Sequence, residues 1–419
     1  GANLDYRAID SFYDYPRVQG LAEMMNSYGV IHNDAEVVSK IVASQAHHKK
    51  IDGHAPGLQG KDLDTYVAAG VYSDHECATM EDALAKLQRG QFIMIREGTA
   101  ARNLEALAPL LTPQYAERCM FCTDDKHPSD LLEKGHIDYI AREAINKYGV
   151  DPIIAVKAAC HHASRYFLLN NRGAIAPGYL ADFAVIDNFK DFNVEMVFKK
   201  GVLYWNNGEL RDFEAPKIEE YLDKRAHDTF HVSTLTPDDF RDTRQRGVLG
   251  MVPGEIITTD NGYADHVDLE KDILKIAVVE RHKGTHHIGL GYIQGYGLKS
   301  GAVATSISHD SHNIIVVGTN SADMAFAANY IVEHHGGIVV VENGTVKGSV
   351  VLEIAGIMSD RPLTEVNDQL EAAKDAAFTL GVSRGIDPFM TLSFMALPVI
   401  PKLRITTRGV VDVDTQQYV

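Results

Sequence analysis

The chain has 419 residues, of which 45% are hydrophobic and 23% are charged, and its formal net charge is −17. This length and composition are typical of a globular protein with two or three domains, and the negative charge argues against nucleic acid as a partner. No run of residues is apolar and long enough to span a membrane, and four cysteines in a chain of this size favour the reducing cytoplasm over a disulfide framework.

Residues 18–149 alternate short β-like runs with helix-like stretches, and five such units follow one another. The helix-like stretches carry apolar residues at three- and four-residue spacing, which is the period of an amphipathic helix. Five β/α units in series predict a parallel sheet, either doubly wound or part of a (β/α)8 barrel.

Chemically active side chains occur where each of these strands is predicted to end. They are Glu23, His54, His75 and Glu76, Arg96 and Glu97, and Asp124 and Asp125. A single carboxylate in such a place is often a helix N-cap or a solvated turn residue, and a single histidine is often a hydrogen-bonded structural residue. Their recurrence at successive strand ends favours a shared pocket, because the parallel strands of a barrel present their carboxyl ends on one face.

Imidazoles and carboxylates that come from different strands suit a divalent metal such as Mn, Fe or Zn. Such a metal lowers the pKa of bound water toward neutrality. A nearby carboxylate can then take the proton of that water and return it to a leaving group. The sequence therefore predicts metal-assisted hydrolysis.

After the β/α series, residues 151–167 are predicted to form an amphipathic helix. Residues 173–187, GAIAPGYLADFAVID, resemble the segment with which amidohydrolase-superfamily enzymes leave the barrel and enter a small β-sandwich. Segments that resemble the adenine deaminase family in particular are 52–63, 73–79, 94–104, 122–128, 289–320 and 387–406. The similarity spans nearly the whole chain.

The resemblance implies an α/β fold, a (β/α)8 TIM-type barrel with a small β-sandwich and a C-terminal α+β domain. Residues 1–168 are expected to form the C-terminal part of the barrel with strands four to eight only, residues 169–222 a segment of the sandwich, and residues 223–419 the C-terminal domain. Amidohydrolases normally supply an H-x-H pair from the first strand, and no such pair precedes Glu23. The chain is therefore expected to be a fragment of a longer parent and to be inactive alone.

The resemblance also implies a reaction, the hydrolysis of adenine to hypoxanthine and ammonia at a two-metal centre, as used in purine salvage. By position, Glu23 matches the carboxylate that bridges the metals, and His54 and His75 match the imidazoles that hold one of them. Asp124 matches an eighth-strand aspartate that also serves as a ligand. Two divalent ions are therefore expected, with Mn or Fe ahead of Zn.

Catalytic roles follow from the same match. Asp124 is expected to accept the proton of the attacking water and to deliver it to the departing amine. Glu76 is the first candidate for the acid that protonates ring N1 of the purine, and Glu97 is the second. The expected partner is adenine as a small-molecule substrate, bound by a homo-oligomer in the cytoplasm.

Four further polar residues receive no role: Asp125, Arg96, His309 and His312. The two histidines stand three residues apart in HDSHN, where they could bind a metal, help to close a pocket, or be satisfied by backbone groups. Two alternative functions stay open. One is another amidohydrolase that acts on a related cyclic amidine or amide, and the other is a non-catalytic relative that lacks the first-strand ligands.

Overall fold

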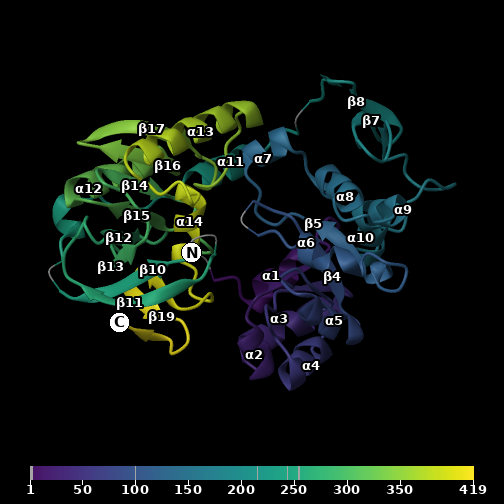
Figure 1. Cartoon of the computed structure of the whole chain (residues 1–419), viewed down its shortest axis with the longest axis horizontal. Helices are drawn as coiled ribbons and strands as arrows, with labels where there is room; N and C mark the ends of the chain where they lie inside the picture. Colours follow the sequence, from purple (N-terminus) through teal and green to yellow (C-terminus); the bar gives the residue numbers. More distant parts are fainter. Residues whose placement is uncertain (1–2, 100, 215, 243, 253–254) are drawn as a thin grey trace. The chain divides into compact units, whose positions relative to one another are not determined.

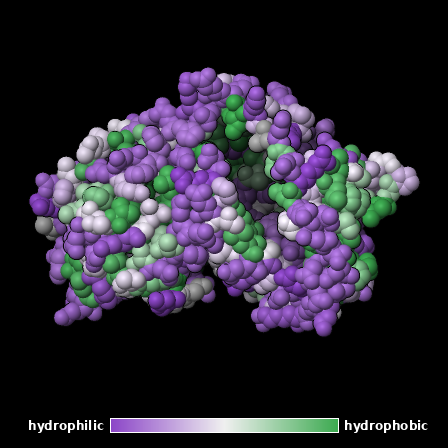
Figure 2. Space-filling model, turned by 90° about the horizontal axis from the view of Figure 1, so that it is seen from above, coloured by the Kyte–Doolittle hydropathy of each residue, from purple (hydrophilic) through white to green (hydrophobic). Residues whose placement is uncertain are grey.

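The computed structural model describes residues 3–99, 101–214, 216–242, 244–252 and 255–419. The chain divides into two compact units, Asn3–Ala215 and Pro216–Val419 (Figure 1). Among the described residues, no helix combines the length and the hydropathy that a bilayer crossing requires. On the face drawn in Figure 2, hydrophobic residues form several separate groups among hydrophilic ones, as on most globular surfaces.

Five parallel strands organise the first unit, in the order in which they occur along the chain. They are β1 (Gly20–Met24), β2 (Lys50–Gly53), β3 (Ser73–Asp74), β4 (Phe92–Arg96) and β5 (Cys119–Cys122). β1 pairs with β2, and β4 lies between β3 and β5. One backbone hydrogen bond joins the two groups, from Tyr72 N to Ile51 O at 2.9 Å. The predicted parallel α/β arrangement is present, as a two-stranded and a three-stranded sheet over the described residues.

Helices connect and flank these strands. They are α1 (Tyr6–Phe12), α2 (Ser27–Ile31), α3 (Ala35–Ala46), α4 (Gly60–Ala68), α5 (Met80–Gln88), α6 (Leu104–Leu107), α7 (Pro128–Glu133), α8 (Ile137–Asn146), α9 (Pro152–Val156) and α10 (His162–Tyr166). Side-chain caps fix where α3 and α5 begin, because Asp34 and Thr79 accept hydrogen bonds from free backbone N–H groups of the first turn. The helix predicted over 151–167 contains a π-helical turn, Lys157–His161, between α9 and α10.

A small antiparallel sheet ends the first unit. Its strands are β6 (Phe183–Ile186), β7 (Val194–Lys199), β8 (Val202–Asn206) and β9 (Glu209–Leu210), paired in chain order. All of its residues are half-buried or exposed. The predicted β-sandwich therefore stays a prediction.

The second unit is built on an eight-stranded mixed sheet. In spatial order its strands are β11 (Thr258–Ala264), β10 (Arg246–Met251), β13 (Ile288–Gln294), β12 (Ile273–Val279), β15 (Ile314–Gly318), β14 (Ala302–Thr305), β16 (Gly337–Glu342) and β17 (Thr345–Val351). The remaining elements are α11 (Glu220–His227), α12 (Ser321–Glu333), α13 (Leu363–Thr379), α14 (Pro388–Met395), β18 (Leu403–Thr406), β19 (Gly409–Asp412) and β20 (Gln417–Tyr418).

Both faces of this sheet are covered, which explains its continuous apolar strands. Ile276 belongs to the core that includes α13, whereas the next residue, Ala277, belongs to the core that includes α12. Successive strand residues point to opposite faces, so a sheet buried on both sides needs an apolar residue at every position. The run IIVVG of β15 has this pattern, and all five of its residues are buried.

Candidate metal centre

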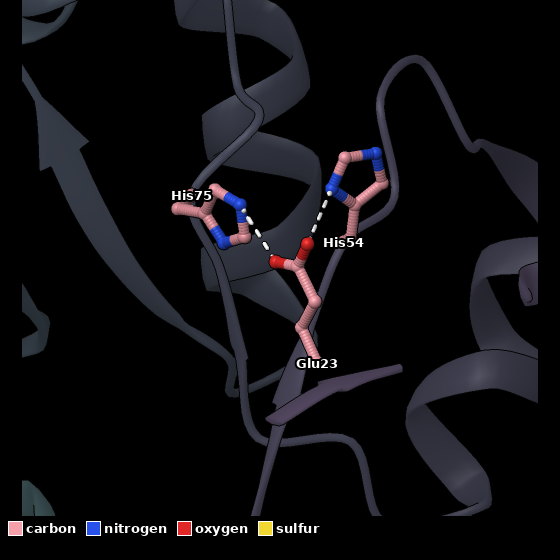
Figure 3. A group of neighbouring side chains, drawn as sticks. All are labelled: Glu23, His54 and His75. Atoms are coloured by element: carbon pink, nitrogen blue, oxygen red, sulfur yellow. Dashed lines mark ion pairs between the residues drawn. The ribbon is translucent and has the colours of Figure 1, made fainter. Parts of the chain in front are cut away.

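Three of the predicted site residues meet at the carboxyl ends of β1, β2 and β3. Glu23 lies in β1, His54 directly follows β2, and His75 directly follows β3. The Glu23 carboxylate lies between the two imidazole rings (Figure 3), with Oε2 2.9 Å from His75 Nε2 and Oε1 3.5 Å from His54 Nδ1. Each residue offers one ligand atom, and these atoms lie within 4.8 Å of one another. One carboxylate and two imidazoles form a donor set that Mn, Fe and Zn accept.

The His54 ring offers an independent sign that a cation fits here. Its Nδ1 atom is buried and makes no hydrogen bond to any described residue, because the carboxylate oxygens nearest to it, from Glu23 and Glu76, lie 3.5 and 3.6 Å away as ion-pair partners. A buried polar atom left in this way costs about 1–3 kcal/mol, whereas a metal ligand would use the lone pair of the neutral ring. The residues present therefore fit a divalent metal.

The electrostatics of the three residues are coupled. Burial alone would raise the pKa of Glu23, but the neighbouring His54 and His75 outweigh it and lower this pKa to about 2. Burial lowers the pKa of His75, yet its hydrogen bond to Glu23 and the negative charges around it raise the pKa above the usual 6.5. In the metal-free protein, Glu23 thus favours the protonated form of His75.

A second group, centred on Arg96, adjoins the first. Arg96 ends β4, is only 6% exposed, and donates to both carboxylate oxygens of Glu76, with Nη2 3.1 Å from Oε2. Its Nη1 also donates to Asp124 Oδ2 at 2.8 Å. Glu76 Oε1 lies 3.4 Å from His75 Nε2 and 3.6 Å from His54 Nδ1. Arg96, which the sequence left without a role, therefore links two of the three candidate acid–base carboxylates, Glu76 and Asp124.

Glu97 and Asp125 make hydrogen bonds to backbone groups, whereas the adjacent Arg96 and Asp124 bind side chains of the site. The Oε2 atom of Glu97 accepts a hydrogen bond from the backbone of Leu104 at 3.4 Å. Burial raises the pKa of Glu97 more than this bond lowers it. Asp125 accepts a hydrogen bond from Thr99 N at its backbone carbonyl, at 2.9 Å, which shapes the loop after β5.

His309 and His312 belong to the second unit and have partners within it. The His309 ring stacks on Phe394, with ring centroids 4.9 Å apart and planes inclined by 10°. His312 Nδ1 accepts from Ser308 N at 3.4 Å, and its backbone carbonyl accepts from Arg281. The interpretation that backbone and neighbouring groups satisfy these histidines is therefore supported by named contacts.

Tyr66 supports the site and was missed by the sequence analysis. It lies on α4 with its side chain fully buried, and its hydroxyl donates to Met24 O at 2.6 Å and accepts from His54 N at 3.0 Å. It therefore ties the end of β1 to the end of β2, next to Glu23 and at His54 itself. A tyrosine on the apolar face of an amphipathic helix carries no sequence signal that separates this role from ordinary core packing.

Comparison with known proteins gives matches along most of the chain. A model described as Amidohydrolase family matches residues 16–204, and one described as Adenine deaminase C-terminal domain matches residues 255–417. An adenine deaminase of Desulfatibacillum aliphaticivorans is 44% identical over 427 residues, which is 100% of this chain and 74% of that protein. An adenine deaminase of Nitratidesulfovibrio vulgaris strain DP4 is 44% identical over 100% of this chain and 74% of that protein. One of Dehalococcoides mccartyi strain 195 is 42% identical over 99% of this chain and 73% of that protein.

Proposed function

The chain belongs to the adenine deaminase family, and we propose that it carries out the family's reaction at the centre formed by Glu23, His54 and His75. The reaction replaces the exocyclic amine of adenine with oxygen from water, giving hypoxanthine and ammonia. Relatives 42–44% identical over the whole chain support this hydrolase activity. The observation that carries the proposed location is the convergence of one carboxylate and two imidazoles from three parallel strands.

Two divalent ions, Mn or Fe ahead of Zn, are the proposed cofactors. Glu23, His54 and His75 would hold metal, and Asp124 is the proposed further ligand, since its carboxylate lies within 4.8 Å of ligand atoms of His75 and Glu76. When bound, such ions lower the pKa of water and so generate a nucleophile at neutral pH. The protein's own carboxylates then have to move the protons.

We assign proton transfer to carboxylates at the strand ends. Asp124 takes a proton from the attacking water and passes it to the leaving amine. For the acid that protonates ring N1, the contacts favour Glu97 over Glu76, because both carboxylate oxygens of Glu76 already accept hydrogen bonds from the Arg96 guanidinium. Burial instead raises the pKa of Glu97 and so favours its protonated form. Glu76 would then orient Arg96 and the imidazoles.

The finer architecture is also a proposal. We assign β1–β5 to the fourth to eighth strands of an amidohydrolase barrel, residues 169–222 to a β-sandwich segment, and residues 223–419 to the C-terminal domain. The parallel pairing of β1–β5 and the Amidohydrolase family match over residues 16–204 support the first assignment. Association into a homo-oligomer stays a prediction.

The test measures ammonia release by residues 1–419 loaded with Mn²⁺, using adenine, adenosine, cytosine and hydantoin as alternative substrates. Sustained release from adenine would support the proposed reaction and would show that the expectation of an inactive chain, which rests on the missing H-x-H pair, is wrong. Adenine is expected to be the preferred substrate. His54→Ala and His75→Ala should abolish both tight Mn²⁺ binding and ammonia release, whereas His32→Ala, which removes an exposed histidine that stacks on Tyr28, should change neither. Preference for a non-purine substrate, or full turnover in His54→Ala or His75→Ala, would overturn the proposal.

A further inference from the structure

A fully buried lysine lies beside the candidate metal centre. Lys86 projects from α5 with a side chain that is 0% exposed. Its Nζ atom donates to Asp74 Oδ2 at 3.0 Å, to Asp82 Oδ2 at 3.0 Å and to Ala55 O at 2.7 Å. Cys77 Sγ lies 3.6 Å from the same atom as a fourth, weaker acceptor. Each of the three protons of the ammonium can therefore meet an acceptor, which is the condition under which a buried charge is tolerated.

Asp74 connects this lysine to both histidine-bearing strand ends. It is the last residue of β3, is fully buried, and directly precedes His75. Its Oδ1 accepts from Ala55 N at 2.7 Å, and its Oδ2 accepts from Glu76 N at 3.0 Å. One carboxylate therefore binds the residue after His54 and the residue after His75.

The other bonds between the two strands lie before the histidines, where Ser73 Oγ accepts from Gly53 N at 3.4 Å and donates to Asp52 Oδ1 at 3.1 Å. β2 and β3 belong to different sheets, and the backbone bond from Tyr72 N to Ile51 O lies before the histidines. Beyond it, Ala55 gives its N–H to Asp74 and its carbonyl to Lys86. The Asp74–Lys86 pair thus supplies the cross-strand bonds where the chain leaves the sheet and His54 and His75 begin.

We propose that Asp74 and Lys86 are positioning residues that hold the His54 and His75 imidazoles at the separation a divalent metal needs. The inference rests on the metal centre proposed above and concerns residues that would not touch the metal. Loss of such supporting groups typically lowers metal affinity about 10- to 100-fold. Asp82 gives a matched comparison, because it bonds to Lys86 but to neither histidine-bearing segment.

The first measurement is the Mn²⁺ affinity of residues 1–419, from competition with a chromophoric chelator. Lys86→Met keeps the length of the side chain and removes its three donors. Asp74→Asn keeps one acceptor oxygen and replaces the other with a donor that faces Glu76 N and Lys86 Nζ. Both variants are expected to weaken Mn²⁺ binding about 10- to 100-fold. Asp82→Asn, and Lys134→Met in the other i,i+4 Asp–Lys pair of this unit, are expected to leave the affinity close to that of the unaltered protein.

The second measurement uses metal-free protein and reports on position directly. The amide proton of Glu76 donates to the Asp74 oxygen that Asp74→Asn replaces, so its hydrogen exchange should become at least about 10-fold faster in this variant. A smaller effect is expected at Ala55, whose acceptor oxygen is kept, and at both amides in Lys86→Met. Ile140→Ala serves as a stability control, since it removes a fully buried side chain from α8 without touching the strand ends. It should lower the melting temperature while leaving Mn²⁺ affinity and exchange at these two amides unchanged.

The outcomes separate this inference from the metal centre itself. If His54→Ala and His75→Ala bind Mn²⁺ as tightly as the unaltered protein, the proposed centre is wrong. If those variants lose the metal while Lys86→Met and Asp74→Asn weaken it no more than Ile140→Ala does, the centre stands and the positioning role is wrong. A 10-fold or greater loss confined to Lys86→Met and Asp74→Asn would support it.

Discussion

Replacing Tyr66 with phenylalanine should destabilise the first unit through two backbone groups beside the site. The Tyr66 hydroxyl donates to Met24 O at 2.6 Å and accepts from His54 N at 3.0 Å, and the side chain is 0% exposed. Burial raises the pKa of Tyr66, so the hydroxyl keeps the proton that it donates. Phenylalanine fills nearly the same space, and the change therefore isolates the loss of these hydrogen bonds.

The magnitude follows from what the substitution leaves behind. A buried polar group without its partner costs about 1–3 kcal/mol, and two such groups are affected. The carbonyl oxygen of Met24 has a second lone pair with which it can accept another hydrogen bond, so most of the free-energy cost comes from the unpaired N–H of His54. We expect the free energy of unfolding of this unit to fall by about 2–4 kcal/mol.

Urea denaturation followed by fluorescence measures this loss. The chain has one tryptophan, Trp205 in β8, which belongs to the same unit as Tyr66 and therefore reports on its unfolding. The control is Tyr28→Phe, since Tyr28 is 70% exposed and its replacement should change stability by less than about 0.5 kcal/mol. A loss in Tyr66→Phe as small as that of the control would refute the reasoning.

Three further outcomes are expected. Asp124→Asn should reduce adenine turnover by about 10²- to 10⁴-fold, which is the usual contribution of an acid–base group. The urea midpoint of this variant should stay unchanged, because the Asp124 side chain is 41% exposed. Normal turnover would remove Asp124 from the mechanism. Mn²⁺ affinity should rise with pH and level off above the raised pKa of His75, because the metal must displace the proton that His75 binds below this pKa. Competition with a chelator from about pH 5.5 to 8.5 measures this pH dependence. An affinity that does not change with pH would contradict the prediction. Arg96→Met should lower kcat for adenine, since the Arg96 guanidinium holds the carboxylates of both Glu76 and Asp124; an unchanged kcat would show that these contacts do not position the two carboxylates.

The sequence predicted that the strand-end residues converge because this prediction depends only on the order and direction of the strands. Parallel strands in chain order bring their carboxyl ends to one edge, and Glu23, His54 and His75 meet there. The roles of adjacent residues could not be predicted in the same way. Side chains of successive strand residues point in opposite directions, so Arg96 faces Glu76 whereas Glu97 accepts a hydrogen bond from the Leu104 backbone. If the predicted end of β4 were shifted by one residue, the predicted directions of these two side chains would be exchanged.

Contributions from the helices were beyond prediction for a different reason. Asp82 and Lys86 stand four residues apart on α5, a spacing typical of an ion pair on a solvated helix face. The structure instead buries Lys86 completely, because Asp74 and the Ala55 carbonyl lie beneath that turn of the helix. No pattern within α5 indicates this environment, since it is made by residues from two other segments.

The charges of the site favour the side beside Glu23 for the first of the proposed metal ions. Three carboxylates, Glu23, Glu76 and Asp124, lie close together, and like charges at such distances destabilise one another. Arg96 binds Glu76 and Asp124 and so offsets the repulsion on that side. Glu23 is left to the imidazoles of His54 and His75, and it raises the pKa of His75 above the usual 6.5. A divalent cation that binds beside Glu23 gains one carboxylate and two neutral ring nitrogens.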